Sequence, residues 1–84
     1  AQDGTATAST DGKTITVKFN RNIADGATFT TDDTNTVITG VTVSGKTATI
    51  TLNNALATGK KITIGTVKDA VYAANTASGD VYTA

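Results

Sequence analysis

The stretch KTITVKFNRNIADG, residues 13–26, starts as an alternating β-strand and then loses its alternation. The apolar residues on one side of the expected strand are Ile15, Val17 and Phe19. Polar residues 20–22 follow, and the next apolar residue is Ile23. Because successive side chains of a strand point to opposite faces, this pattern predicts a strand with one face in a core. We interpret the polar break as the point where the strand leaves its sheet, crosses the end of a sandwich and returns Ile23 to the core.

The composition favours β-strands throughout the chain. Of the 84 residues, 20 are threonine, and none is proline, cysteine, methionine, tryptophan, histidine or glutamate. Threonine, valine and isoleucine fit pleated, half-buried surfaces, and apolar residues recur at period two, a pattern that a disordered chain lacks. The runs follow one another at spacings of roughly eight to twelve residues. The sequence therefore predicts an all-β fold, an antiparallel β-sandwich of about six to seven short strands, in a single domain over residues 1–84.

Turn chemistry predicts two hairpins. Asp11-Gly12 is a strong hairpin signal because both residues tolerate a positive φ. The pairs that this turn predicts are Ala8 with Ile15 and Ala6 with Val17, with the alanines inside. In VTVSGKTATITL, residues 41–52, Ser44-Gly45 is the expected two-residue turn. The pairs that follow are Val43 with Lys46, Val41 with Ala48, Thr39 with Ile50 and Val37 with Leu52.

Fifteen side chains are expected to face the core. They are Ile15, Val17, Phe19, Ile23, Phe29, Val37, Val41, Val43, Ile50, Leu52, Leu56, Ile62, Ile64, Val67 and Val71. Among them, Leu56 is expected to close the end of the core where the chain changes sheets. Gly65 is a candidate β-bulge. Residues 80–84 form the expected last strand, which brings Val81 or Tyr82 to the core.

Charge and residue types argue against several functions. Seven Lys and Arg balance seven Asp, so the chain has no basic face for nucleic acid. No run of about 18 apolar residues exists, so we expect no membrane insertion. Without histidine or cysteine, no base is present to activate a Ser or Thr nucleophile in the usual pair, so we expect no catalytic residues. A Lys-Asn isopeptide bond would need a buried lysine and an acidic catalyst, whereas Lys18 alternates outward and glutamate is absent.

Calcium is the more serious candidate ligand, because loops rich in Asp, Asn and Thr supply the oxygens that calcium takes. TTDDTNT, residues 30–36, contains Asp32 and Asp33, and Asp69 with Asn75 forms a second cluster. Neither cluster has the spaced acidic pattern of a helix-loop-helix calcium site. A sequence of this kind leaves open both a site within the domain and one shared with a neighbouring domain. No other cofactor is expected.

Three stretches in order carry a family resemblance: TITVKFNRNI, GVTVSGKTATITL and ALATGKKITIGTVKDAVYAAN. They resemble the bacterial immunoglobulin-like domains that are repeated in surface-layer proteins and other large exported surface proteins. The residues that fill the family's positions are Phe19 with Ile23, Leu56 with Gly59, and Val67 with Asp69 and Asn75. The chain departs from the pattern at Ile62, where an aromatic residue is usual, and in lacking proline before Ile23. The resemblance covers residues 5–84 and implies an immunoglobulin-like sandwich.

The resemblance and the composition together predict a role outside the bacterial cell. The family implies a non-enzymatic structural or spacer module of a surface-layer protein, whose partners are neighbouring domains and other copies of the parent chain. The chain opens on Ala1 without a signal sequence, so we expect it to be part of a larger multidomain surface protein. The alternative is a carbohydrate- or ligand-binding module of a secreted enzyme or adhesin, with Tyr72 and Tyr82 as stacking candidates.

Overall fold

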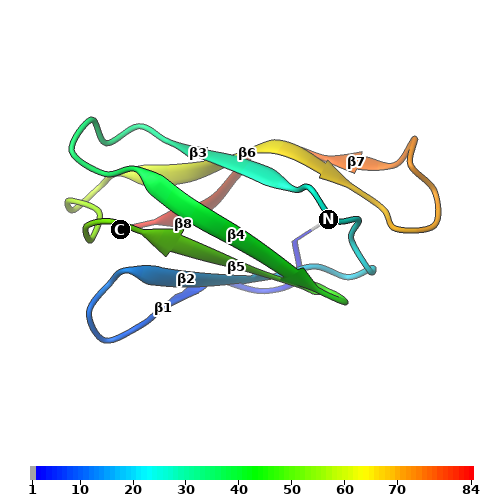
Figure 1. The fold of residues 1–84 in the computed structure, drawn as a ribbon, viewed down its shortest axis with the longest axis horizontal. Coiled ribbons are helices and arrows are strands. Elements are labelled where there is room, and N and C mark those ends of the chain that lie inside the picture. The colour runs from blue at the N-terminus through cyan, green and yellow to red at the C-terminus, as the bar shows by residue number, and fades with distance from the viewer. Residues whose placement is uncertain (1) are drawn as a thin grey trace.

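Two antiparallel sheets of four strands each form the fold in the computed structural model, which describes residues 2–84 (Figure 1). The first sheet has, in spatial order, β1 (Thr7–Ala8), β2 (Thr14–Lys18), β5 (Thr47–Leu52) and β4 (Ile38–Ser44). In the second, β6 (Lys61–Lys68) pairs on one side with β3 (Thr28–Thr31) and on the other with β7 (Thr76–Ala77) and β8 (Asp80–Thr83). This is the strand order of a constant-type immunoglobulin sandwich, with β7 and β8 as two halves of its last strand. Residues 2–84 include no helix that could cross a membrane.

The polar break after β2 is the crossing from the first sheet to the second, as predicted. Phe19 and Ile23 are buried at 2% and 7% exposure. The amide of Ile23 donates to the carbonyl of Gly45 beside the first sheet at 3.0 Å. The next amide, of Ala24, donates to the carbonyl of Lys68 in β6 at 2.8 Å. Residues 20–24 therefore close one end of the sandwich and join the two sheets there.

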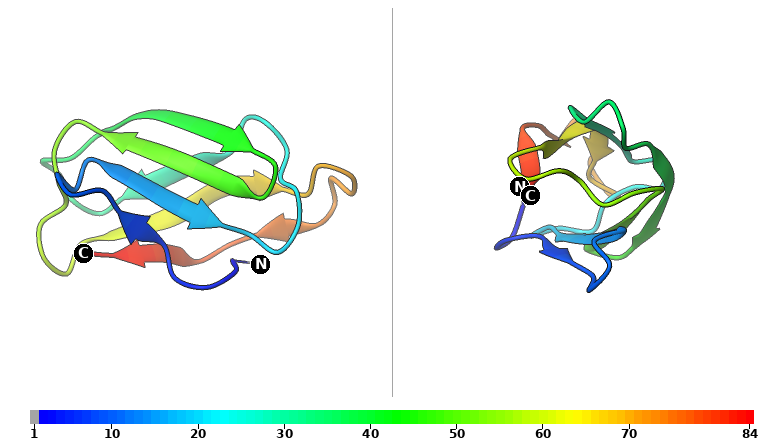
Figure 2. Two further views of the ribbon diagram at one scale, coloured as in Figure 1. Left: turned by 90° about the horizontal axis from the view of Figure 1, so that it is seen from below. Right: turned by 90° about the vertical axis from the view of Figure 1, so that its left-hand side faces the viewer.

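The pairing of β1 with β2 has the predicted register, with Ala8 opposite Ile15 and Thr7 opposite Thr16. Ala6 is buried, as expected. The prediction that Ala8 also lies inside is wrong, because this alanine ends a two-residue edge strand and is exposed there. On this side of the sandwich the segment around β1 runs beside β8 (Figure 2).

The turn between β4 and β5 differs from the prediction by one residue. The loop is Gly45-Lys46, so Ser44 pairs with Thr47, Val43 with Ala48 and Val41 with Ile50. Of the two loop residues, only Gly45 has a positive φ, of 59°, which fits a turn with glycine at its first central position. Residues 40–44 of β4 therefore pair two positions further along β5 than expected. Because side chains alternate with period two, the same side chains of residues 41–43 still face the core.

An irregularity at Thr39 reverses the expected facing at the start of β4. The register shifts between Ile38 and Gly40, which adds one residue to β4 opposite β5. Ile38 rather than Val37 is thereby set opposite Leu52 and packs against the core. The prediction that Val37 faces the core is wrong, since it is 58% exposed.

The core lies between the two sheets, which face each other when the molecule is viewed end on (Figure 2). Ten of the fifteen expected side chains are buried: Ile15, Val17, Phe19, Ile23, Phe29, Ile50, Leu52, Ile62, Ile64 and Val67. Val41, Val43 and Leu56 are partly buried against them. Val81 completes the core from β8, as predicted, with Ala6, Ala27 and Ala48. Val71 is 72% exposed, so its prediction is wrong, because it lies in a loop that projects beyond the sheets.

Gly65 is the bulge residue of β6, as predicted. Thr28 pairs with Thr66 and the next residue, Phe29, pairs with Ile64, so Gly65 has no partner across the ladder. A Cβ atom at Gly65 would lie 2.7 Å from Oγ1 and 3.2 Å from the carbonyl oxygen of Thr28. Glycine is therefore needed here for the close approach of β3.

Candidate functional site

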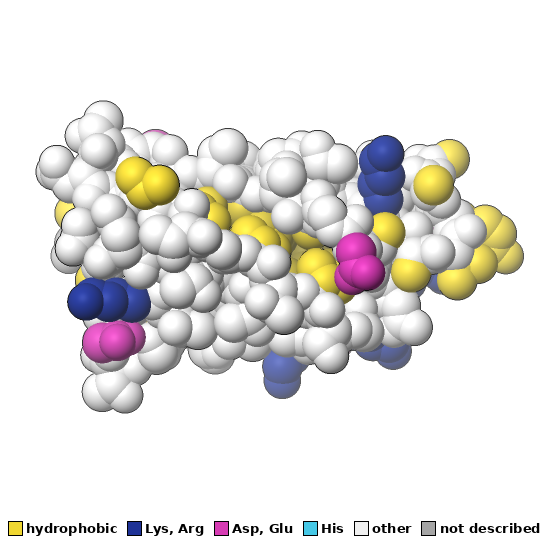
Figure 3. Space-filling view, in the orientation of Figure 1, with side chains coloured by type: hydrophobic (Ala, Val, Ile, Leu, Met, Phe, Trp, Pro, Cys, Tyr) yellow, Lys and Arg dark blue, Asp and Glu magenta, His cyan; other side chains and the backbone are white. Residues whose placement is uncertain are grey.

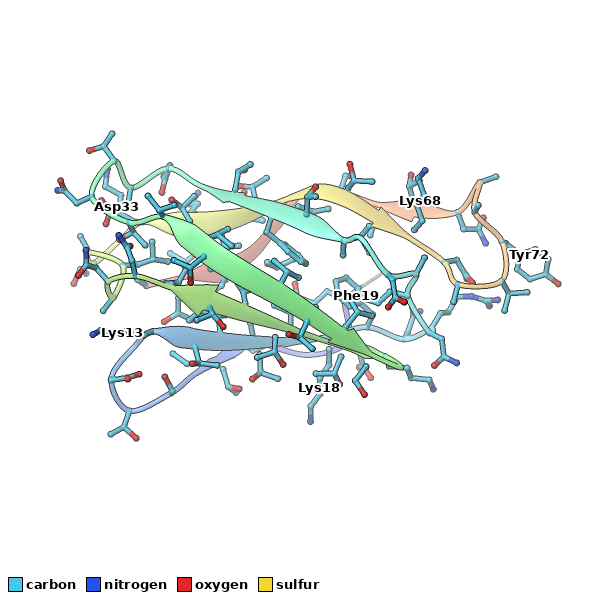
Figure 4. All side chains as sticks on the ribbon, viewed as in Figure 1. Lys13, Lys18, Phe19, Asp33, Lys68 and Tyr72 are labelled. Carbon is cyan, nitrogen blue, oxygen red and sulfur yellow. The ribbon has the colours of Figure 1, made fainter. Side chains whose placement is uncertain are left out.

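Asp33 is buried at one end of the sandwich, where its carboxylate joins two loops (Figure 4). Its Oδ1 accepts a hydrogen bond from the amide of Asn35 at 2.9 Å, and its Oδ2 accepts one from the amide of Ala57 at 3.0 Å. These hydrogen bonds, that from Ala57 first, hold the pKa of Asp33 below its ordinary value. Asp33 therefore ties the loop after β3 to the loop after β5.

The neighbouring Asp32 has a different partner. Its Oδ1 accepts a hydrogen bond from the amide of Lys61 at 2.7 Å, at the first residue of β6. The amide of Asp32 donates in return to the carbonyl of Lys61 at 3.3 Å. The carboxylates of Asp32 and Asp33 thus bind amides of separate segments. A calcium ion in this loop would have to share oxygens that already accept hydrogen bonds, and melting in calcium and in chelator is the test of a site here.

Asp69 organises the loop at the opposite end of β6. Its side chain is 4% exposed. Oδ1 accepts hydrogen bonds from the amides of Val71 and Tyr72, at 2.8 and 3.2 Å. Oδ2 accepts one from Nε of Arg21 in an ion pair. The amide of Val71 and then the guanidinium of Arg21 lower the pKa of Asp69, so this carboxylate is held in its charged form.

Asn75, expected to join Asp69 in a calcium cluster, contributes backbone groups to the same loop. Its carbonyl accepts a hydrogen bond from the amide of Asp69 at 2.9 Å, and its amide donates to the carbonyl of Tyr72 at 2.8 Å. Asp32 binds Lys61 at the start of β6, so eight residues of extended strand, about 26 Å, separate it from Asp69. The structure therefore does not bring the three predicted aspartates together. Within residues 2–84, no cluster of three acidic side chains that could hold a metal ion is present.

Arg21 also packs on an aromatic ring. Its Cζ lies 5.6 Å from the centre of the Tyr72 ring, a distance that allows a cation–π contact. Tyr72 is 59% exposed and lies at the tip of the projecting loop (Figure 4). The polar break of residues 20–22 thus holds the 69–75 loop through Arg21, and the amide of Ala70 adds a hydrogen bond to the carbonyl of Asn22 at 2.9 Å.

The two tyrosines do not form a joint stacking platform. Tyr82 pairs with Ile62 near the start of β6 and packs partly against the core, whereas Tyr72 lies beyond the other end of that strand. Lys18 is exposed and points away from the sandwich, as its place in the alternation predicted (Figure 4). The predicted aromatic and basic candidates are therefore spread over separate surfaces.

Two hollows mark the surface near these residues. A cavity of about 50 Å³ lies beside Arg21, Asp69 and Asn75, a volume that suits water rather than a sugar ring. A wider groove of about 460 Å³ lies between the segment before β1 and β8, where Gln2 and Tyr82 line it. The side-chain amide of Gln2 donates to the carbonyl of Val81 across this groove at 2.9 Å.

The family profile of the bacterial Ig-like domain matches residues 2–83, nearly the whole chain. The chain belongs to the bacterial Ig-like domain family. No curated protein and no solved structure shows significant similarity to it. Bacterial Ig-like domains are in general non-catalytic modules and typically occur in surface or exported proteins. Membership thus supports the sandwich fold and a non-enzymatic surface module.

In this Ig-like domain, sequence reasoning missed the role of Arg21. The pair that it forms with Asp69 spans 48 positions of the chain, so no local pattern shows it. One signal was present: Arg21 is the only arginine of the chain, and it stands in the polar break that the fold uses to change sheets. An arginine suits this position because its guanidinium can bind a carboxylate and stack on a ring at once.

Proposed function

We propose that this Ig-like domain is a spacer module of a bacterial surface-layer protein, which sets the distance between neighbouring domains and contacts other copies of the parent chain outside the cell. The work of the domain is mechanical, and no reaction is assigned to it. The surface-layer role is supported by the threonine- and alanine-rich composition without cysteine or methionine, which is typical of exported bacterial surface proteins.

The observation that carries the proposal is the way in which both ends of the sandwich are tied. At one end Asp33 joins two loops, and at the other Asp69 and Arg21 hold the projecting loop to the crossing segment. The domain is elongated, with extents of 35 × 21 × 20 Å. The two buried carboxylates lie at opposite ends, too far apart for paired acid–base chemistry on one substrate. Both serve to fix loops, which suits a rigid module that transmits force and keeps distance.

The proposal is tested in the parent protein. One parent variant lacks residues 2–83, and a matched control replaces them with an unrelated Ig-like domain of similar length. We expect the deletion to abolish the ordered assembly or to change its spacing by up to the 35 Å length of the module, and we expect the replacement to restore the spacing, as measured by electron microscopy. A parent that forms no ordered assembly, or a deletion with unchanged spacing, would contradict the proposal.

A carbohydrate-binding role is the second candidate, and the groove beside β8 favours it. This groove combines the partly exposed ring of Tyr82 with the polar side chains of Gln2 and Asp80, and its volume falls in the range of ligand sites. A titration with cell-wall and plant glycans, followed by amide shifts, tests it. Saturable shifts that a Tyr82→Ala variant loses and a Tyr72→Ala variant keeps would establish this role in place of the spacer role.

A further inference from the structure

Strand β4 differs from the other edge strands of the sandwich. It is the outer strand of the first sheet and is seven residues long, whereas the edges formed by β1, β3, β7 and β8 have two to four residues each. An edge strand carries unpaired backbone groups, which make it a template for another strand. Natural edges are blunted by short length, charge or cover, and the edges other than β4 are short.

The edge of the second sheet at β8 is protected by charge and by cover. β8 begins at Asp80, whose carboxylate lies 3.5 Å from Nζ of Lys61. Farther along β8, the carbonyl of Val81 accepts a hydrogen bond from the side chain of Gln2. By contrast, residues 38–44 have the sequence ITGVTVS and include no charged side chain. Residues 41–43 of β4 therefore lack charge and cover, and the irregularity at Thr39 lies before them, so their ladder with β5 is regular.

The apolar side chains of β4 are also incompletely covered. Ile38, Val41 and Val43 are only partly buried, whereas their partners in β5, Leu52, Ile50 and Ala48, are buried. Val37, just before β4, is exposed. In Figure 3 apolar atoms line a hollow along the open side of the sandwich, between β3 and β4. A strand added at β4 would extend the sheet over this hollow and cover these side chains.

The register of the β4–β5 hairpin shows which backbone groups are free. The two-residue loop makes Ser44 and Thr47 a hydrogen-bonded pair, and the pattern then alternates along the ladder. The backbone groups of Thr42 therefore point to β5, and those of Val41 and Val43 point away from it. Two donors and two acceptors are available at these two residues.

We propose that β4 pairs antiparallel with β4 of a second copy of this chain, about a twofold axis at Thr42. In this register Val41 of one copy forms a hydrogen-bonded pair with Val43 of the other, which uses the free groups of both residues. Val41 and Val43 share the core-facing side, and Thr42 lies directly opposite Thr42 on the outer face. Pairs of β-branched residues and threonine pairs are favourable across strands.

Charge supports a second copy as the occupant. A twofold strand pair sets each residue near its own equivalent, so a charged edge would repel itself, but β4 is uncharged. The chain as a whole has a net charge of zero, so no long-range repulsion keeps copies apart. The contact is small compared with a stable dimer interface, so we expect weak association that becomes important where many copies are held close together.

Pairing through β4 rests on the proposed contact between copies of the parent chain. The test of this pairing uses the isolated domain, so a negative result would not contradict the spacer role. The probe is the domain itself, studied by sedimentation equilibrium and amide NMR from micromolar to millimolar concentration. We expect the average mass to rise toward the dimer, with concentration-dependent shifts centred on the amides of Val41 and Val43. A mass that stays monomeric at millimolar concentration, or shifts centred on residues 70–74 instead, would overturn the proposal.

Charged substitutions at Thr42 test the register of this pairing. Thr42→Lys and Thr42→Asp each set like charges face to face across the axis and should weaken association by about tenfold or more. An equimolar mixture of the two should restore it as a heterodimer. Thr49→Lys is the matched control, because Thr49 lies beside Thr42 on the same face but in the inner strand β5. Amide spectra establish that each variant is folded. Unchanged association of Thr42→Lys, no recovery in the mixture, or equal loss with Thr49→Lys would each refute pairing through β4.

Discussion

Arg21 and Asp69 lie 48 positions apart in the chain and form an ion pair that joins the crossing segment to the loop after β6. The two partners differ in environment, since the side chain of Arg21 is 53% exposed and that of Asp69 is 4% exposed. Asp69 also accepts two amide hydrogen bonds from its own loop. The carboxylate is thus the fixed centre of this end of the sandwich, and Arg21 covers it from the outside.

Replacing Arg21 with glutamine should loosen the 69–75 loop while leaving the sheets intact. The variant removes the charged partner of Asp69 and the contact with the Tyr72 ring. We expect the amides of Val71 and Tyr72 to exchange with solvent up to about tenfold faster, because a typical hydrogen bond contributes modestly to stability. Hydrogen exchange followed by NMR measures this, with Lys18→Gln as an exposed control that removes a charge elsewhere. Equal exchange in both variants would mean that Arg21 does not hold the loop.

Stability should fall in acid because the native carboxylates are charged. The pKa of Asp33 is lowered by the amide of Ala57 and that of Asp69 by the amide of Val71, each from an ordinary value of 3.8. A group with a lowered pKa in the folded state stabilises the fold fully above its unfolded pKa, and this contribution is lost as the pH falls through the folded value. The melting temperature should therefore be level near neutral pH and drop below about pH 3.8.

The control for the acid transition is a variant with Asp33→Asn and Asp69→Asn together. Its melting temperature should depend less on pH between about pH 4 and pH 2 than that of the native domain. Some dependence should remain, because hydrogen bonds from Ser9 and Thr63 lower the pKa of Asp11 and Asp80 as well. Parallel curves for the two proteins would show that the buried aspartates are not responsible for acid unfolding.

Gly65→Ala should destabilise the sandwich by about 1–3 kcal/mol, the usual cost of overpacking. The added methyl group would meet Thr28 at 2.7 Å and force β3 away from β6. The matched control is Gly40→Ala, where a Cβ atom would meet nothing within 4 Å. Denaturant unfolding of both variants measures the difference. A Gly65→Ala variant as stable as Gly40→Ala would contradict the close approach of the two strands.

Calcium should leave the melting temperature of the isolated domain unchanged. The carboxylates of Asp32, Asp33 and Asp69 already bind backbone amides, and they lie at two ends of the molecule. Calcium favours six to eight oxygen ligands that converge on one point. Melting in calcium and in chelator tests this, and a higher melting temperature in calcium, lost in Asp33→Asn, would place an ion at the 30–36 loop.

The sequence predicted the fold well where local patterns act alone, and poorly where distant segments set the outcome. The period-two runs and the polar break identified β2, its crossing and most of the core. The turn was predicted one residue too early, because Ser44-Gly45 satisfies the same local requirement as Gly45-Lys46 and both registers set the same side chains of residues 41–43 toward the core. The exposure of Val37 follows from an irregularity at Thr39, and the adjacent Gly40 is the same kind of bulge signal that identified Gly65 but was not used here.

For the candidate site, too, the sequence predicted the local features and not the distant partners. Asp33 and Asp69 stood out from the sequence as acidic residues in polar loops, and the structure places both at loop ties. Their partners, Ala57 and Arg21, are 24 and 48 positions away, so only the folded chain brings them together. A carboxylate that accepts amide hydrogen bonds and one that binds calcium have the same local sequence signature, which is why the sequence left the two alternatives open.

The central claim is that both ends of this domain are held rigid by carboxylate hydrogen bonds, so that it can act as a spacer. Backbone ¹⁵N relaxation of the isolated domain tests this claim most directly. We expect order parameters of about 0.85 for residues 32–36 and 69–75, equal to those of the strands. Values below about 0.6 in either loop would show a flexible end and contradict the account.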